Sequence, residues 1–195
     1  SSTVAYCQTD TPPFDNNDVR LAIKYATNRQ QMLDLYYQGF GALMNDTPIP
    51  GFIDGGLPGV RERSVAKAKE HLSRAGYPDG IDLTLEMAKW TNEDQWATIW
   101  QAGLAEAGIR VEIQQRPTDG YWGDVWLQDG HPFALSGWNV RPTHAGLGLW
   151  YVSTANWNES RFKSETFDAN YAKAKATVND AERIKLYHAC IKEVQ

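Results

Sequence analysis

Helical spacing of apolar residues is clearest near the start of the chain. Four such residues follow the i, i+3, i+4, i+7 pattern of one helix face: Val19, Ala22, Ile23 and Ala26. Asn28 and Gln31 then have the spacing of a capping box, which marks the start of another helix. The pattern therefore predicts two consecutive helices, with a break at Asn28 and the second helix running through Tyr37.

A strand, a helix and a strand are predicted in order over residues 81–113. Alternation of period two points one set of side chains one way (Ile81, Leu83, Leu85 and Met87) and another set the other way (Asp82, Thr84 and Glu86). Thr91 and Asp94 have capping-box spacing ahead of an apolar helix, and a second alternating strand begins at Ile109. This order is the βαβ signature, so we expect parallel pairing, a right-handed crossover and an α/β fold.

The other predicted elements follow from turn and capping residues. In chain order they are a strand over Thr3–Gln8, a long ordered loop over Gly39–Gly59, a helix capped by Ser64 and ended by Gly76, a helix from Pro117 through Gln128, a strand over Phe133–Trp138, an aromatic loop through Ser160, and two closing helices of which the second begins at Asp180. The loop over residues 39–59 is dense in Gly and Pro, so packing from elsewhere must hold it.

The composition is that of an ordinary globular domain, with 42% hydrophobic and 22% charged residues. The length of 195 residues favours one compact unit, and no apolar stretch approaches the roughly 20 residues that span a bilayer. A net charge of -5 without any basic run excludes a nucleic-acid backbone as the partner. The chain begins with Ser1 and ends within a predicted helix, so we expect it to be truncated at both ends relative to a longer protein.

Motifs for catalysis and metal binding do not occur in the sequence. HExxH, GxSxG and a Gly-rich phosphate loop are absent, and three of the four histidines are scattered. His188 and Cys190 lie about 200° apart around a helix axis, which excludes a nucleophile–base pair. We therefore expect no enzyme activity, no metal and no cofactor, while paired carboxylates far apart in the sequence stay open. The sequence does not decide whether Cys7 and Cys190 form a disulfide.

Eight tryptophans are the unusual feature of the composition. Four of them fall within predicted helices, where packing is the expected role: Trp96, Trp100, Trp122 and Trp126. Trp90 and Trp138 each end a predicted strand, and ligands of α/β lobes collect at the carboxyl ends of strands. An indole offers apolar area and one N–H donor, so we expect both in a ligand cleft. Trp150 and Trp157 lie in the predicted aromatic loop, a place that also suits a ligand cleft. Trp157 precedes the polar run 158–160, which suits either a ligand contact or a turn.

Arg141 lies three residues after Trp138 in the run Gly137–Pro142. Pro142 restricts the backbone of Arg141 to an extended shape, so the loop is stiff and presents the guanidinium. Two interpretations stay open: a bidentate grip on a ligand carboxylate, or an arginine that is solvated or paired with a structural carboxylate. We expect Asn139 to belong to the same ligand site.

Several runs of the sequence resemble the family 5 solute-binding proteins, the dipeptide-, oligopeptide- and nickel-binding group. In chain order the matching runs are Pro13-Phe14-Asp15, Asp18 to Ala22, Asn28-Arg29, Thr47 to Gly51, Ala68-Lys69, Ala75 to Gly80, Leu104 to Ile109, Gly137-Trp138 and Phe167-Asp168. They cover nearly the whole chain, and their shared order is far more specific than any one of them.

The resemblance implies a binding function without catalytic residues. It implies a periplasmic-binding-protein-like lobe of the class II type, with a mixed sheet flanked by helices, in which residues 1–195 form the second of two lobes that close on a ligand. The full protein is then the monomeric, periplasmic or extracytoplasmic binding component of an ABC transporter, delivering a peptide or another small solute to a membrane permease. The ligand-contacting residues expected in this lobe are Trp90, Trp138, Asn139, Arg141 and Trp157.

One position departs from the family pattern. Peptide-binding members usually carry an Asp three residues after the tryptophan of the Gly-Trp pair, where it binds the peptide ammonium, and Arg141 stands there. A cation repels an amino terminus, so we expect an anionic ligand group or a peptide bound in another manner. An opine or sugar conjugate is the alternative ligand. From a different class, a glycan-binding or glycan-acting module uses the same indoles, and a purely structural contact with the permease is a third interpretation.

Overall fold

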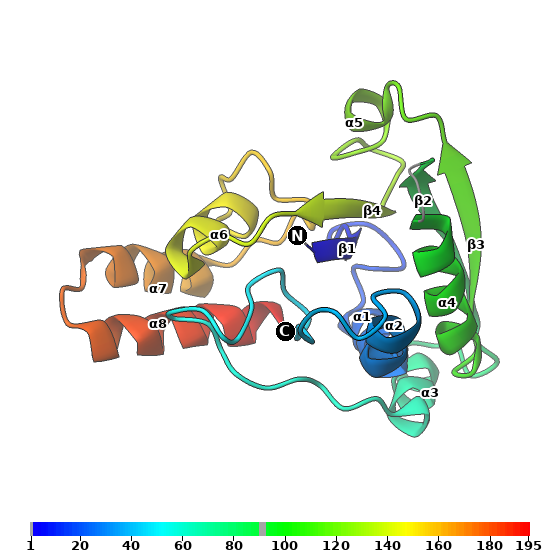
Figure 1. Ribbon diagram of the computed structural model, residues 1–195, viewed down its shortest axis with the longest axis horizontal. Helices are drawn as coiled ribbons and strands as arrows, with labels where there is room; N and C mark the ends of the chain where they lie inside the picture. Colours follow the sequence, from blue (N-terminus) through cyan, green and yellow to red (C-terminus); the bar gives the residue numbers. More distant parts are fainter. Residues whose placement is uncertain (1, 90–92) are drawn as a thin grey trace. The chain divides into compact units, whose positions relative to one another are not determined.

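The computed structural model describes residues 2–89 and 93–195 (Figure 1). The chain forms two compact units. The first comprises the N-terminal residues through Val4, Met44–Val60 and Gly137–Gln195, and the second comprises Ala5–Leu43 and Arg61–Ser136. The chain passes from one unit to the other inside two strands, β1 (Ser2–Cys7) and β4 (Phe133–Trp138). Each unit therefore depends on segments that are far apart in the sequence.

Two helices of the second unit begin where the sequence predicts. α1 (Asn17–Ala26) buries all four residues of the predicted apolar face. α2 (Arg29–Leu35) begins after Asn28, whose side-chain oxygen accepts a hydrogen bond from the Gln31 backbone N–H at 3.1 Å. The break at Asn28 is confirmed, because the capping side chain satisfies an N–H that the helix itself leaves unpaired. α2 ends at Leu35 rather than at the predicted Tyr37.

The predicted βαβ order is present in the second unit. β2 (Ile81–Ala88), α4 (Glu93–Ala105) and β3 (Ile109–Arg116) follow one another, and α4 packs along β3 (Figure 1). β2 pairs in parallel with β3, in a register that runs from Ile81 opposite Ile109 to Ala88 opposite Arg116. At the start of this pair, a Cβ on Gly80 would collide with the carbonyl oxygen of Gly108, so glycine is required there. Thr91, which the sequence assigns to the cap of α4, lies outside the described residues.

The strands form one sheet in the order β1-β4-β2-β3. β2 also pairs in parallel with β4, with Glu86 opposite Ala134. One face of these strands packs with α1, α4 and α3 (Val65–Arg74), and α3 begins after the predicted cap Ser64. The largest core cluster contains the four apolar side chains predicted for β2 and two of the predicted helix tryptophans: Ile81, Leu83, Leu85, Met87, Trp96 and Trp100. The α/β class is confirmed.

Glu86 differs in burial from the other polar side chains of β2. Asp82 and Thr84 are exposed, but Glu86 is only 6% exposed. Arg116, at the end of β3, donates to both carboxylate oxygens of Glu86, from Nε at 2.6 Å and from Nη2 at 2.8 Å. A buried carboxylate is stable only where donors replace water, so the bidentate pair explains the burial. The alternation of β2 does not by itself predict this burial.

The helix predicted from Pro117 through Gln128 is wrong in its extent. A single turn forms, α5 (Tyr121–Asp124), and Leu127 then adopts a left-handed φ of 64°, which cannot continue a helix. Trp122 is 47% exposed and packs edge-on against two neighbouring aromatic rings. Its assignment to the packing of a helix is therefore also wrong, whereas Trp126 is half-buried against a small core cluster.

α6 (Thr143–Trp150), in the first unit, occupies part of the segment that the sequence predicts as an aromatic loop. That prediction is wrong for these residues. Gly146 and Gly148 weaken the local preference for a helix, but a Cβ on Gly148 would collide with the hydroxyl of Tyr171, so glycine permits close packing there. Burial of Leu147 and Trp150 then stabilises a helix that local propensity does not favour.

The chain closes with α7 (Glu165–Ala176) and α8 (Asp180–Val194), which lie side by side (Figure 1). Both were predicted. Ser164 caps α7 by accepting a hydrogen bond from the Phe167 N–H at 3.1 Å. Asn179 caps α8, and Asp180, the predicted cap, is the first helical residue. An Asp in the first turn still interacts favourably with the positive end of the helix dipole.

The long segment between α2 and α3 contains no helix or strand, and all of it is described. Its part in the first unit, Met44–Val60, is held by side chains of α6 and α8. The Thr143 hydroxyl donates to the carbonyl oxygen of Asp54 at 2.6 Å, and Nε2 of His188 lies 2.9 Å from the carbonyl oxygen of Gly56. These contacts supply the partners that a loop lacks, which confirms the prediction of an ordered loop.

Candidate functional site

The first unit gathers three tryptophans around the end of β4. The ring centroid of Trp138, the last residue of β4, lies 5.3 Å from that of Trp150 and 5.7 Å from that of Trp157. Trp150 is 3% exposed, Trp138 is 9% exposed and Trp157 is 42% exposed. The three indoles thus lead from the core of the unit to its surface, and Trp157 is the one that offers a large aromatic face to a ligand.

A buried carboxylate fixes the central indole. Nε1 of Trp138 donates a hydrogen bond to Oε2 of Glu159 at 2.9 Å, and Glu159 is 7% exposed. Burying a carboxylate is unfavourable unless donors surround it, so this indole N–H contributes to the stability of the site. The N–H of Trp138 is therefore already used inside the protein, and what this residue can offer a ligand is the edge or face of its ring.

Tyr151, directly after α6, lies near the same carboxylate. Burial raises the pKa of its phenol, a hydrogen bond with the Thr47 side chain lowers it, and the negative charges of Glu159 and Asp46 raise it. The net pKa stands well above its ordinary value, so the phenol is neutral at physiological pH.

Arg141 stands in the short connection between β4 and α6. Its side chain is half-buried, and its Nε is buried without a hydrogen-bond partner among the described residues. In the same described part of the chain Arg141 forms no ion pair. A buried donor without an acceptor costs about 1–3 kcal/mol. An acceptor that reached this nitrogen would therefore bind with a gain in free energy.

The predicted ligand residues are placed as follows. Trp138 and Trp157 are in contact, and Asn139 and Arg141 lie in the connection that follows Trp138, where Asn139 is exposed. Trp90 lies outside the described residues. The role of all five residues in ligand binding stays a prediction.

The run after Trp157 forms a turn. Nδ2 of Asn158 donates to the carbonyl oxygen of Phe162 at 2.7 Å, and the hydroxyl of Ser160 donates to Oδ1 of Asn158 at 3.0 Å. Of the two interpretations left open by the sequence, the turn describes Asn158 and Ser160. Between them, Glu159 points into the unit and meets Trp138.

Sequence reasoning missed Glu159 and Tyr151 as members of this cluster, and it placed Trp150 in a loop rather than in a helix. Trp150 and Tyr151 end a stretch that was read as a loop, and Glu159 was considered only as part of a polar run. These residues share only their closeness to Trp138 in the folded chain. Glu159, which bonds to Trp138, is 21 residues away from it in the sequence. Local periodicity carries no information about such a contact.

Possible metal ligands and the two cysteine thiols in the described residues do not form a reactive site. No group of three or more His, Cys, Asp or Glu side chains is placed there to hold a metal ion. Cys7 and Cys190 are free thiols, and burial is the main cause that raises the pKa of each to about 11. Both thiols are therefore protonated at physiological pH and are poor nucleophiles. A separate search of the described helices finds none with the length and apolarity needed to cross a membrane.

Comparison with known families decides what kind of protein carries this cluster. Residues 1–160 match the family model of the bacterial extracellular solute-binding proteins, family 5, middle region. The chain belongs to this family. The resemblance seen in the sequence is confirmed.

Two curated relatives of this family 5 chain share less than a third of its residues in the aligned regions. The glutathione-binding protein GsiB of Pectobacterium atrosepticum is 28% identical over 192 residues, which cover 90% of this chain and 36% of GsiB. Heme-binding protein A of Haemophilus influenzae is 30% identical over 200 residues, which cover 94% of this chain and 36% of the relative. The chain thus spans little more than a third of the length of these relatives.

A solved structure supports the same fold. The ABC transporter-associated periplasmic binding protein DppA from Helicobacter pylori, in complex with the peptide STSA, matches with a TM-score of 0.88 and 30% sequence identity. The match covers 99% of this family 5 chain and 39% of DppA. The predicted periplasmic-binding-protein-like fold is confirmed. The relatives named here are binding proteins.

Proposed function

We propose that this chain is part of the substrate-binding component of an ABC importer, and that it forms one of two lobes that close on a peptide or peptide-like solute. The observation that carries the proposal is the match to the peptide complex of DppA, which extends over 99% of the chain at 30% identity. The names of two relatives, which bind glutathione and heme, agree with a small-solute function. Glutathione is itself a peptide.

The proposal extends to the whole protein. The full protein is a monomer outside the cytoplasm, it delivers its ligand to a membrane permease, and it catalyses no reaction. Ligand binding shifts the equilibrium between open and closed lobes only by the difference in its affinity for the two states. Since this chain supplies one part of the contacts, it binds the ligand weakly by itself.

We infer that Trp138, Asn139, Arg141 and Trp157 contact the ligand, together with Trp90. The exposed ring of Trp157 supports this role because it presents apolar area beside a buried indole. The unpartnered Nε of Arg141 supports it because a ligand carboxylate would satisfy that donor.

A peptide can bind here in another manner than in family members that carry an Asp at the position of Arg141. Arg141 supplies a cation that can meet the carboxylate group of a peptide.

A thermal-shift screen of the full-length protein tests the proposal. Peptides, opines and acidic sugars are compared, because a ligand that binds only the folded state stabilises it by about 2.7 kcal/mol at a hundredfold excess over its Kd. We expect stabilisation by peptides. Stabilisation by opines or acidic sugars alone would transfer the function to carboxylate-bearing non-peptides, and no stabilisation by any class would contradict the proposed ligand.

A further inference from the structure

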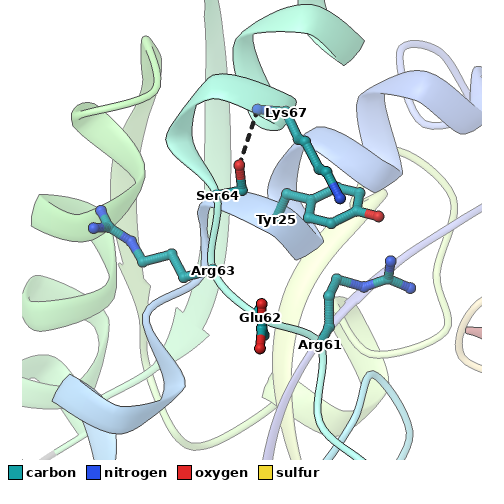
Figure 2. A pocket seen from close by; sticks show the side chains of 6 residues that line it. All are labelled: Tyr25, Arg61, Glu62, Arg63, Ser64 and Lys67. Atoms are coloured by element: carbon teal, nitrogen blue, oxygen red, sulfur yellow. Dashed lines mark hydrogen bonds between the residues drawn. The ribbon is translucent and has the colours of Figure 1, made fainter.

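Arg141 lacks the internal partners that hold other arginines of this chain. Its Nε is buried without a hydrogen-bond partner among the described residues. Arg63, which lines a cavity at the start of α3 (Figure 2), instead donates from Nε to the carbonyl oxygen of Ala26 at 3.1 Å. In the same cavity Cζ of Arg61 lies 4.8 Å from the ring centroid of Tyr25. Both of those guanidinium groups interact within the protein, whereas Arg141 keeps a donor that only an incoming group can satisfy.

Exposed apolar area lies at the same end of β4. Trp157 is 42% exposed, and its ring centroid lies 5.7 Å from that of Trp138. Val140, in the connection that follows Trp138, is 48% exposed. Exposed apolar side chains that gather in one place mark binding surfaces, since packing inside the protein does not use them. The end of β4 therefore offers both a cation and apolar area.

The covalent chain keeps the cation close to the indoles. Arg141 follows Trp138 by three residues, so their Cα atoms lie within about 11 Å of each other. Trp157 is in ring contact with Trp138. In an amino acid, the side chain and the α-carboxylate are attached to the same carbon atom when the residue ends a peptide. One C-terminal residue is therefore of the right size to meet both Arg141 and Trp157.

The acidic side chain of the tryptophan cluster does not compete for this surface. Glu159 is 7% exposed, and its Oε2 accepts the hydrogen bond from Nε1 of Trp138 at 2.9 Å. Asp168, a second carboxylate of the same unit, accepts a hydrogen bond from the Ser153 N–H at 3.0 Å. Arg141 forms an ion pair with neither of them in the described part of the chain. Its positive charge is thus available to a carboxylate of the solute.

We propose that this surface binds the C-terminal residue of a peptide, with the α-carboxylate on Arg141 and an aromatic side chain against Trp157. The inference rests on the proposed function, and it adds the orientation of the peptide and the chemistry of its last residue. A carboxylate accepts two hydrogen bonds from one guanidinium, and an indole favours an aromatic ring in an offset or edge-on arrangement. A peptide that has only one of these features at its C-terminus binds more weakly.

Calorimetric titration of the full-length protein with three tripeptides tests the orientation. The probes are Ala-Ala-Phe, its C-terminal amide, and Phe-Ala-Ala, which has the same composition and charge as the first. We expect Ala-Ala-Phe to bind about tenfold more tightly than either of the others. The amide lacks the charged acceptor for Arg141, and Phe-Ala-Ala carries its aromatic ring at the wrong end.

Two variants assign these preferences to residues. Arg141→Gln should bind Ala-Ala-Phe and its amide with similar affinity, and Trp157→Ala should bind Ala-Ala-Phe and Phe-Ala-Ala with similar affinity. Lys173→Gln, at an exposed position of α7, and Phe40→Ala, at a position of the second unit that is 82% exposed, are the matched controls and should keep both preferences. A variant that only loosens the fold weakens the binding of all three peptides and leaves their ratios unchanged.

The outcomes distinguish this inference from the proposed function. Equal affinity of the wild type for acid and amide, or for Ala-Ala-Phe and Phe-Ala-Ala, would overturn the inference and leave peptide binding in place. Preferences that persist in Arg141→Gln and Trp157→Ala would also overturn it, because other residues would then recognise the C-terminus. Binding of none of the three peptides, while other peptides stabilise the protein in the thermal-shift screen, would overturn the inference alone. Binding of no peptide in either experiment would contradict the proposed function as well.

Discussion

Nε1 of Trp138 and Oε2 of Glu159 are joined by a hydrogen bond of 2.9 Å, which ties the end of β4 to a turn 21 residues later. Both residues are buried. The bond orients the indole that contacts Trp150 on one hand and Trp157 on the other. The aromatic surface that we propose for the ligand therefore depends on a buried hydrogen bond, which the ligand itself need not contact.

Replacing Trp138 by Phe tests this relationship. Trp138→Phe keeps an aromatic ring but leaves the Glu159 carboxylate buried with one donor fewer, so we expect a loss of about 1–3 kcal/mol in the free energy of unfolding. Urea denaturation measures it. Trp122→Phe is the control, because Trp122 is exposed and its replacement should change stability by less than about 0.5 kcal/mol. Equal effects of the two substitutions would show that the hydrogen bond to Glu159 does not stabilise the fold.

Arg141→Gln separates ligand binding from stability. In the full-length protein we expect the affinity for carboxylate-bearing ligands to fall about tenfold, because a charged donor becomes a neutral one. Calorimetric titration with the best ligand of the screen measures the change. Lys173→Gln removes the same charge from an exposed position of α7 and should leave the affinity unchanged. An unchanged affinity in Arg141→Gln would remove Arg141 from the site.

Acid should weaken the fold through Glu86. Hydrogen bonds from Arg116 lower the pKa of this carboxyl below its ordinary value of 4.5, against an opposing effect of burial. A group whose pKa is depressed in the folded state stabilises the fold above its unfolded pKa, and that contribution is lost as pH falls through the folded pKa. Denaturation at pH 7 and at successively lower pH, below 4.5, should therefore show declining stability, with a smaller decline in Glu86→Gln. The same decline in both proteins would assign the acid sensitivity to other carboxylates.

Removing Arg116 tests the same pair at neutral pH. Arg116→Met leaves the Glu86 carboxylate buried without its bidentate donor, while Met retains much of the apolar stem. Since Arg116 is partly exposed, we expect a lower free energy of unfolding, with a loss smaller than that for a fully buried pair. Arg110→Met is the matched control, because the pair of Arg110 with Asp82 is exposed on both sides. The prediction fails if the two variants are equally stable.

Thr143→Val should loosen the loop that contains Asp54. The valine keeps the shape of the buried threonine but cannot donate to the carbonyl oxygen of Asp54, which we expect to cost about 1 kcal/mol. Amide hydrogen exchange of residues 52–56 should become faster, as local opening needs less free energy. Thr166→Val, at an exposed position of α7, is the control. Unchanged exchange in Thr143→Val would mean that other contacts hold the loop.

The predictions that succeeded rest on signals confined to short segments. The cap at Asn28, the cap at Ser64 and the alternation of β2 each need only a few neighbouring residues, because helix starts and pleated strands repeat over short distances. The features that the sequence did not predict depend on residues far away in the chain. Glu86 is buried because Arg116 lies 30 residues later in the adjacent strand. α6 is stabilised by burial of Leu147 and Trp150, and Gly148 permits close packing against Tyr171 of α7.

The candidate site divides in the same way. The position of Trp138 at the end of a strand was predictable, since Phe133–Trp138 has the composition and bounds of a strand. The cluster of Trp138 with Trp150, Trp157 and Glu159 was not, because it joins β4, α6 and a turn. Likewise, the cavity at α3 combines Tyr25 of α1 with residues 61–67, and no pattern in either segment indicates that they share it.

By itself the sequence determined the α/β class, the order of most helices and strands and the membership of family 5. These properties are encoded in local spacing and in ordered motifs. The tertiary structure alone decided which polar groups are buried, which tryptophans meet, and where charge collects against a ring. Burial and charge pairing are properties of side chains brought together from distant segments, and their free energies exist only once the chain has folded.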